Sequence, residues 1–261
     1  MAKLLYLFLR FLTLLMHLFP LRVHYIVSDI LCLFVKDIIG YRKKVVYKNL
    51  HNSFPEKDQK EIEEVASRFY HHFCDQIIEM LYFANISAKE IEKRISYSGL
   101  ELIHEALDNN RPVIAMLGHY GNWEWLSSFG LKTDKSFFML YKPLHSEGMD
   151  HFMKYMRSRQ RAIPLPKDNA FRTLIGYAIR KKPTFSGFIA DQTPKVDDIQ
   201  HWVTFLNQPT AVFLGAEKIG RKTNSRIVFA HMAKPRRGYY HCDIYMIDDQ
   251  PAQSPEYTST E

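Results

Sequence analysis

The sequence contains only three cysteines, Cys32, Cys74 and Cys242, among its 261 residues. They are odd in number and far apart, so we do not expect a disulfide framework, and a reducing compartment is favoured. Internal repeats and low-complexity tracts are also absent. For a chain of this length, one large domain, or one domain plus an anchor, is the expected organisation.

Signatures of nucleic-acid binding and metal binding are missing as well. The sequence has no paired zinc ligands and no RNP-like aromatic block, so no nucleic-acid partner is expected. It lacks the HExxH pattern and a clear third ligand, so neither a metal nor another cofactor is expected. Residues 215–223 mimic a phosphate loop, but Arg221 follows the second glycine in place of lysine, which argues against nucleotide binding. The net charge of +7 instead favours phospholipid headgroups, phosphorylated lipids or acidic proteins.

No apolar run at the N-terminus is long enough for a simple membrane span. Residues 4–19 are strongly apolar, but Pro20 ends them after about 24 Å of helix, against about 30 Å of hydrocarbon. Arg10 interrupts this run, which also argues against a secretory signal. Residues 25–39 are amphipathic and lead into a basic patch at 41–44. We therefore predict that residues 1–40 form a membrane-associated helical segment, with a pair of ordinary core helices as the alternative.

Beyond residue 110 the sequence alternates between short apolar runs and helical patterns. This alternation predicts an α/β fold, with a mixed sheet flanked by helices, over residues 41–261. A long amphipathic helix is expected at 56–83 before it. Strands are expected at 112–117, 136–141, 162–165, 184–190, 226–230 and 239–247. Further helices are expected at 122–130, 147–160, 168–182 and 210–222.

The candidate active site follows the first of these strands. His119 lies between Gly118 and Gly121, where the strand gives way to a helix, and active sites of open α/β sheets form at such points. With Asn122 as the N-cap, Glu124 would stand in the first helical turn and could accept the Nδ1–H of His119. His119 would then act as general base on a substrate hydroxyl, with backbone N–H groups near Gly121 holding the oxyanion. Spacing alone is equally typical of a structural loop histidine.

The stretch from Leu117 to Glu124 resembles the HxxxxD/E block of the lysophospholipid acyltransferase superfamily. More narrowly, it is similar to that of the bacterial lipid A biosynthesis (lauroyl/myristoyl) acyltransferases. Four further blocks of this family resemble segments of the chain, in the family's order and over nearly the whole length. These segments are 41–55, Tyr141-Lys142-Pro143 with Arg157, Ala190-Asp191-Gln192, and Phe205-Leu206 with Pro209-Thr210 and Gly215-Ala216-Glu217.

The resemblance implies an acyl-carrier-protein thioester as donor and a hydroxyl of a lipid A precursor as acceptor. It places the protein on the cytoplasmic face of a bacterial inner membrane, with His119 and Glu124 as catalytic residues. The residues expected to contact substrate are Gly121, Asn122, Lys142, Arg157, Arg159 and Asp191. The three basic residues among them would bind lipid phosphates or the acidic carrier protein. A turn-capping role is the alternative for Asp191, and simple surface solvation is the alternative for the basic residues.

Other activities remain open from the sequence. The acceptor could be a lysophospholipid, an aminolipid or another anionic lipid. With water as the acceptor the protein would be a thioesterase, and without catalysis it would be a protein that binds anionic lipid. Family members usually continue into a C-terminal helical segment with tryptophan and basic residues, which leaves open a truncated C-terminus here.

Overall fold

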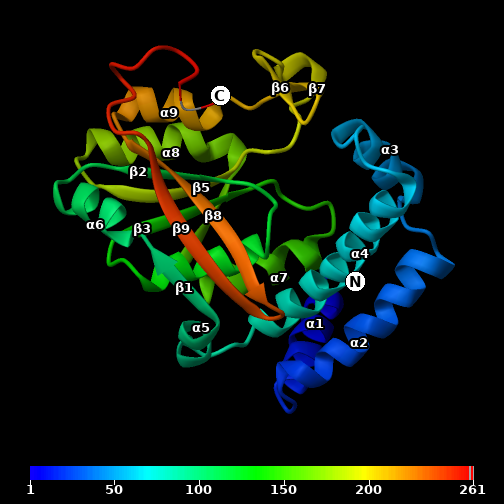
Figure 1. The fold of residues 1–261 in the computed structure, drawn as a ribbon. Coiled ribbons are helices and arrows are strands. Elements are labelled where there is room, and N and C mark those ends of the chain that lie inside the picture. The colour runs from blue at the N-terminus through cyan, green and yellow to red at the C-terminus, as the bar shows by residue number, and fades with distance from the viewer. Residues whose placement is uncertain (259, 261) are drawn as a thin grey trace.

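A computed structural model describes residues 1–258 and 260, and its central feature is a seven-stranded sheet with the strand order β1-β9-β8-β2-β5-β3-β4 (Figure 1). The strands are β1 (Ile95–Ser98), β2 (Val113–Leu117), β3 (Ser136–Tyr141), β4 (Ala162–Pro166), β5 (Thr184–Ile189), β8 (Arg226–Arg236) and β9 (Tyr239–Asp248). All neighbours pair in parallel except β8 and β9, which form an antiparallel hairpin. The predicted α/β fold with a mixed sheet is therefore confirmed.

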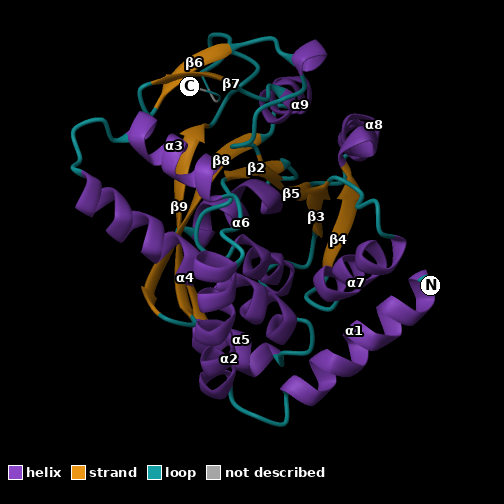
Figure 2. Cartoon of the chain, turned by 90° about the vertical axis from the view of Figure 1, so that its right-hand side faces the viewer, coloured by secondary structure: helices purple, strands orange, loops and turns teal. Residues whose placement is uncertain are grey.

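Helices cover both faces of this sheet. They are α1 (Ala2–Met16), α2 (Leu21–Leu33), α3 (Lys43–Ser53), α4 (Gln59–Phe83), α5 (Ala88–Arg94), α6 (Leu100–Asp108), α7 (Glu147–Ser158), α8 (Lys167–Ile179) and α9 (Gly215–Thr223). A π-helical turn (Phe34–Ile38) extends α2, and two 3₁₀ segments occupy Trp123–Leu131 and Val196–Asp198. Helices α8 and α9 cover one face, and α4, α6 and α7 lie on the other (Figures 1 and 2).

Strand periodicity explains why the sheet carries a core on each face. Along β2, Val113, Ala115 and Leu117 point into the larger core, while Ile114 points to the opposite side and contacts α8 and α9. Successive side chains of a strand alternate between faces, so a strand buried on both sides reads as one continuous apolar run. This is why the run at 112–117 was recognisable as a buried strand.

The N-terminal helices share the larger core with the rest of the chain. Leu9 and Met16 of α1 and Leu21 and Tyr25 of α2 are buried in it, with α1 against α7 and α2 against α4. Arg10 is accommodated by Tyr155, whose ring centroid lies 3.6 Å from the guanidinium carbon. Within the part of the chain that the structure describes, no helix combines the length and the apolar character that a membrane crossing requires.

Several of the element boundaries expected from the sequence were wrong. The helix expected at 210–222 begins only at Gly215, because 208–211 form strand β7 (Gln208–Ala211), which pairs with β6 (Trp202–Phe205). The basic patch continues into α3, and the short β1, α5 and α6 were not expected. The long helix begins at Gln59, where Asp58 and Glu61 form a reciprocal capping box.

Candidate functional site

The site lies where two neighbouring parallel strands end. Strands β2 and β5 pair in register, with Leu117 opposite Ile189, so the residues two positions beyond each strand lie side by side. These residues are His119 and Asp191. Nδ1 of His119 lies 2.6 Å from Oδ1 of Asp191, and the backbone N–H of His119 donates to Oδ2 at 2.7 Å. One carboxylate thus holds both the backbone and the ring of the histidine.

This arrangement corrects the predicted partner of His119. From the sequence, Glu124 was expected to accept the Nδ1–H of His119, and Asp191 was expected to contact substrate or cap a turn. The structure gives the contact to Asp191 instead. Burial alone would raise the pKa of Asp191, but the hydrogen bonds from the His119 side chain and backbone outweigh it and lower that pKa. Asp191 is therefore ionised at neutral pH and can stabilise a charge on the imidazole.

Glu124 forms a buried ion pair with Arg157. The Nε and Nη2 atoms of Arg157 donate to the two carboxylate oxygens of Glu124 at 2.9 and 2.6 Å. Both residues are nearly inaccessible, with 6% and 7% of their surfaces exposed. Such fork-to-fork pairs are strong and directional, so this pair joins the 3₁₀ segment after His119 to helix α7. The guanidinium of Arg157 is thus engaged inside the protein, which corrects its predicted contact with lipid phosphate.

The two remaining basic candidates lie at different edges of the sheet. Lys142 directly follows β3, which pairs with β5, so it stands at the same strand ends as Asp191 and is exposed. Arg159 is also exposed but caps the C-terminus of α7. Because α7 returns the chain to the start of β4, Arg159 lies near the N-terminal ends of the parallel strands, away from Lys142. Only Lys142 shares an edge with His119.

Side chains of helix α4 form hydrogen bonds to the loop that carries His119. Gly121 has a φ of +60°, and a methyl group there would lie 2.5 Å from Cγ of Met232. The Nε2 of His72 donates to the Gly121 carbonyl at 3.2 Å, and the side-chain amide of Gln76 donates to the same oxygen. The loop therefore needs glycine at this position both for its conformation and for the close approach of β8.

Asn122 occupies the N-cap position but does not cap through its side chain. Its amide nitrogen donates instead to the buried carboxylate of Glu79, at 2.8 Å. Only 2% of Asn122 is exposed, so its amide faces the interior of the protein and not the open side of the loop. The predicted N-cap position of Asn122 is therefore confirmed, but its side chain bonds to Glu79 on α4, a partner that the sequence did not indicate.

The outer nitrogen of His119 faces a different environment. Its Nε2 lies 3.3 Å from the amide nitrogen of Gln192, and about a third of the His119 side chain (32%) is accessible. Trp123 packs edge-on against the ring at a centroid distance of 4.7 Å. With Nδ1 bound by Asp191, the tautomer that carries its proton on Nδ1 leaves Nε2 as an acceptor. The imidazole can therefore take a proton from a group approaching from outside.

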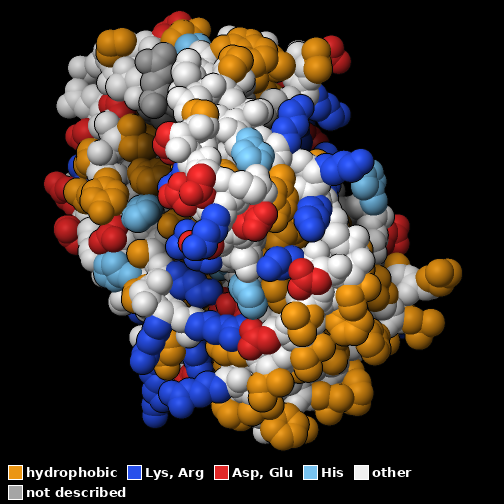
Figure 3. Space-filling model, turned by 45° about the vertical axis from the view of Figure 1, so that its right-hand side comes forward, with side chains coloured by type: hydrophobic (Ala, Val, Ile, Leu, Met, Phe, Trp, Pro, Cys, Tyr) orange, Lys and Arg blue, Asp and Glu red, His pale blue; other side chains and the backbone are white. Residues whose placement is uncertain are grey.

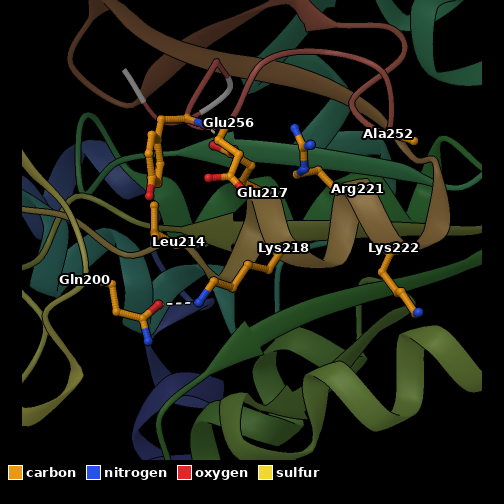
Figure 4. A pocket seen from close by; sticks show the side chains of 9 residues that line it. Gln200, Leu214, Glu217, Lys218, Arg221, Lys222, Ala252 and Glu256 are labelled. Atoms are coloured by element: carbon orange, nitrogen blue, oxygen red, sulfur yellow. Dashed lines mark hydrogen bonds between the residues drawn. The ribbon is translucent and has the colours of Figure 1, made fainter.

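A separate cavity of about 470 Å³ lies beside α9 and does not include these residues. Glu217, Lys218, Arg221 and Lys222 line it from α9, together with Gln200 and the C-terminal residues Glu256 and Tyr257 (Figure 4). Its lining mixes charges of both signs, and the Lys218 ammonium donates to the side-chain oxygen of Gln200. Across residues 1–258 and 260, no group of three or more His, Cys, Asp or Glu side chains could hold a metal ion.

Comparison with known proteins gives the family. None of the curated proteins matches the chain. The model of the family described as bacterial lipid A biosynthesis acyltransferase matches residues 2–258, which include the His119 loop, Asp191 and the Glu124–Arg157 pair. Because this match covers nearly the whole chain, the chain belongs to the bacterial lipid A biosynthesis acyltransferase family.

Proposed function

We propose that the protein transfers a fatty acyl chain from an acyl-carrier-protein thioester to a hydroxyl of a lipid A precursor. The observation that carries the proposal is the His119–Asp191 pair at the strand ends of β2 and β5, with Nε2 directed away from the carboxylate. A histidine oriented in this way is the base that an alcohol nucleophile needs at neutral pH. Family membership supports the class of reaction and the lipid A acceptor.

In the proposed reaction, Nε2 of His119 removes the proton of the acceptor hydroxyl as its oxygen attacks the thioester carbonyl carbon. The tetrahedral intermediate collapses, the C–S bond breaks, and the imidazolium returns the proton to the departing thiolate. Asp191 holds the ring and stabilises its positive charge while the intermediate exists. Glu124 contributes indirectly, by fixing the segment after the loop to α7 through Arg157.

Two groups near His119 suit the remaining needs of this reaction. The amide of Gln192 occupies the space beside Nε2 that the acceptor hydroxyl would take, so we propose that the acceptor displaces it. The Gly121 carbonyl points at α4. In a trans peptide the N–H of the following residue, Asn122, points the opposite way, and we propose it as a donor to the oxyanion.

We further propose that the protein lies on the cytoplasmic face of the bacterial inner membrane through its N-terminal helices. Large apolar side chains gather over α1, α2 and the π-helical turn, and Figure 3 shows them as one continuous hydrophobic area. Those at least half exposed are Leu4, Leu7, Phe8, Phe11, Leu14, Leu18, Phe19, Ile26, Val27, Ile30, Leu33, Ile38 and Ile39. Exposed Lys43, Lys44 and Lys48 on α3 would meet anionic headgroups next to this area.

The test is an assay of the purified chain with an acyl-carrier-protein thioester and a lipid A precursor, read by mass spectrometry. We expect a product heavier by one acyl chain. His119→Ala should reduce its rate by about 10²–10⁴-fold, the usual contribution of a general base. An unchanged rate in that variant, with its unfolding midpoint intact, would refute the role of His119.

The same assay separates the alternative acceptors. If the acyl chain appears only on an added lysophospholipid or aminolipid, the acceptor proposed here is wrong. If free fatty acid is released at the same rate with and without an acceptor, the protein is a thioesterase. If neither product forms although the chain binds anionic vesicles, the protein is a lipid-binding member of the family.

A further inference from the structure

One face of α4 is lined by polar side chains directed at the active-site loop. His72, Gln76 and Glu79 follow each other at intervals of four and three residues, which places them on one side of a helix. The first two donate to the Gly121 carbonyl, and the third accepts from the Asn122 amide. Every one of these contacts falls on the two residues that follow His119 and Tyr120 in the loop.

Glu79 is the centre of this group. Its side chain is completely buried, and it accepts hydrogen bonds from three separate parts of the chain. The hydroxyl of Tyr25, on α2, donates to Oε1 at 2.7 Å. The amide of Asn122 and the hydroxyl of Tyr240, on β9, donate to Oε2 at 2.8 and 2.5 Å. Glu79 thus joins α2, strand β9 and the loop that follows His119.

The hydrogen-bonding roles in this cluster are fixed. Burial and the nearby Glu79 carboxylate raise the pKa values of Tyr25 and Tyr240, so both hydroxyls keep their protons and act as donors. A carboxylate in the interior is costly unless hydrogen bonds satisfy it, and an apolar side chain would fill the space without that cost. Nothing in the acyl-transfer steps uses Glu79 directly, which leaves its contacts as its contribution.

We propose that Glu79 is a positioning residue for His119, and that Tyr25 links Glu79 to α2, one of the helices that we propose to contact the membrane. This inference rests on the proposed function of His119 as base. Glu79 holds Asn122, and with Gln76 and His72 it fixes the turn at Gly121. The ring of His119 then stays on Asp191 with Nε2 turned outward. A shift of about 1 Å in such a turn can cost on the order of 10²-fold in rate, because the base no longer lines up with the hydroxyl.

The principal test compares Glu79→Leu with Glu79→Gln, using the acyl-carrier-protein thioester and the lipid A precursor as substrates. Leucine removes the acceptor for all three donors, and we expect kcat to fall by about 10²-fold while KM changes less than about threefold. Glutamine keeps one oxygen for Asn122 and Tyr240, and its amide can donate to the Tyr25 oxygen. Glu79→Gln should therefore recover most of kcat.

A spectroscopic measurement reports on the loop without relying on turnover. The Nδ1 of His119 lies 2.6 Å from Oδ1 of Asp191. The NMR signal of its proton can be recorded in a sample with labelled histidines, and it is assigned because it disappears in His119→Ala. We expect this signal to shift or broaden in Glu79→Leu and to persist in Glu79→Gln. Should the wild-type chain show no acyl transfer, the proposed function fails, and this signal alone decides the positioning role.

A matched pair of variants covers the case in which Glu79→Leu does not fold. Tyr25→Phe and Ser28→Ala each remove one hydroxyl that α2 donates to a carboxylate of α4. Ser28 donates to Asp75 at 2.8 Å, and Asp75 bonds to the β8–β9 hairpin and not to the loop. We expect Tyr25→Phe to lower kcat severalfold and Ser28→Ala to leave it unchanged. Equal effects of the two, or a kcat for folded Glu79→Leu within threefold of wild type with an unshifted His119 signal, would overturn the proposal.

Discussion

Replacement of Asp191 by asparagine tests the assignment of the histidine's partner. The carboxylate of Asp191 accepts from both the backbone N–H and the Nδ1 of His119, at 2.7 and 2.6 Å. Asparagine offers a single oxygen, so one of these two donors would face an amide N–H₂ group. The variant should therefore tilt the ring, and it also removes the negative charge that faces the imidazolium during the reaction.

The magnitude follows from the distance and the exposure of the pair. Two unit charges 2.6 Å apart interact by about 1.6 kcal/mol at a dielectric constant of 80 and about 6 kcal/mol at 20. The side chains are 32% and 44% exposed, so solvent screens the pair substantially. We take about 3 kcal/mol, which corresponds to a fall in kcat of about 10²-fold.

The assay is acyl transfer by Asp191→Asn, with Glu124→Gln and Asp168→Asn measured beside it. Asp168, an exposed carboxylate at the start of α8, should tolerate the change. Glu124→Gln leaves the buried Arg157 underpaired, so we expect a loss of about 3 kcal/mol of unfolding free energy and a smaller effect on kcat than in Asp191→Asn. If Glu124→Gln lowers kcat as much as Asp191→Asn without loss of stability, Glu124 reaches His119 during turnover and this reasoning fails.

Three more outcomes are expected. Gly121→Ala should lose about 1–3 kcal/mol of unfolding free energy in urea titrations, because its φ of +60° and the close β8 side chain leave no room for Cβ; no loss would contradict the described turn. Burial favours a raised pKa for Asp75, but its bonds to arginine, serine and lysine lower that pKa below the ordinary value of 3.8. The stability that Asp75 contributes is therefore fully present above pH 3.8 and is lost as the pH falls through the lowered pKa, so the destabilisation caused by Asp75→Asn at pH 7 should shrink as the pH is taken below 3.8; a destabilisation of constant size at every pH would refute this. The double variant Phe8→Asp/Ile26→Asp should bind phosphatidylglycerol vesicles about 10²-fold more weakly in flotation assays. The control variant Ile179→Asp, at an exposed position on α8, should bind them as the wild type does. Equal binding by all variants would exclude the N-terminal helices as the membrane face.

Local patterns were sufficient to predict much of the α/β scaffold. The apolar run at 112–117 and the helical pattern at 147–160 became β2 and α7 with small boundary changes. Segments whose structure depends on distant partners were not predicted. The hairpin of β6 and β7 is held to α3 by hydrogen bonds from Asn52 and Asn207, which lie more than 150 residues from their partners. No local window contains such a contact, so residues 210 and 211 were assigned to the helix that follows.

The sequence by itself determined the family, the kind of sheet and the place of His119 at the end of a buried strand, because strand periods and a motif of eight residues are local properties. The tertiary structure decided which carboxylate serves the histidine. Glu124 is only five positions away along the chain but turns inward to Arg157, whereas Asp191 lies 72 positions away and meets the ring because β5 pairs with β2. The order of strands in a parallel sheet decides which strand ends lie next to each other, and that order depends on how the helices pack on both faces. The geometry of this site therefore arises only when the whole chain has folded.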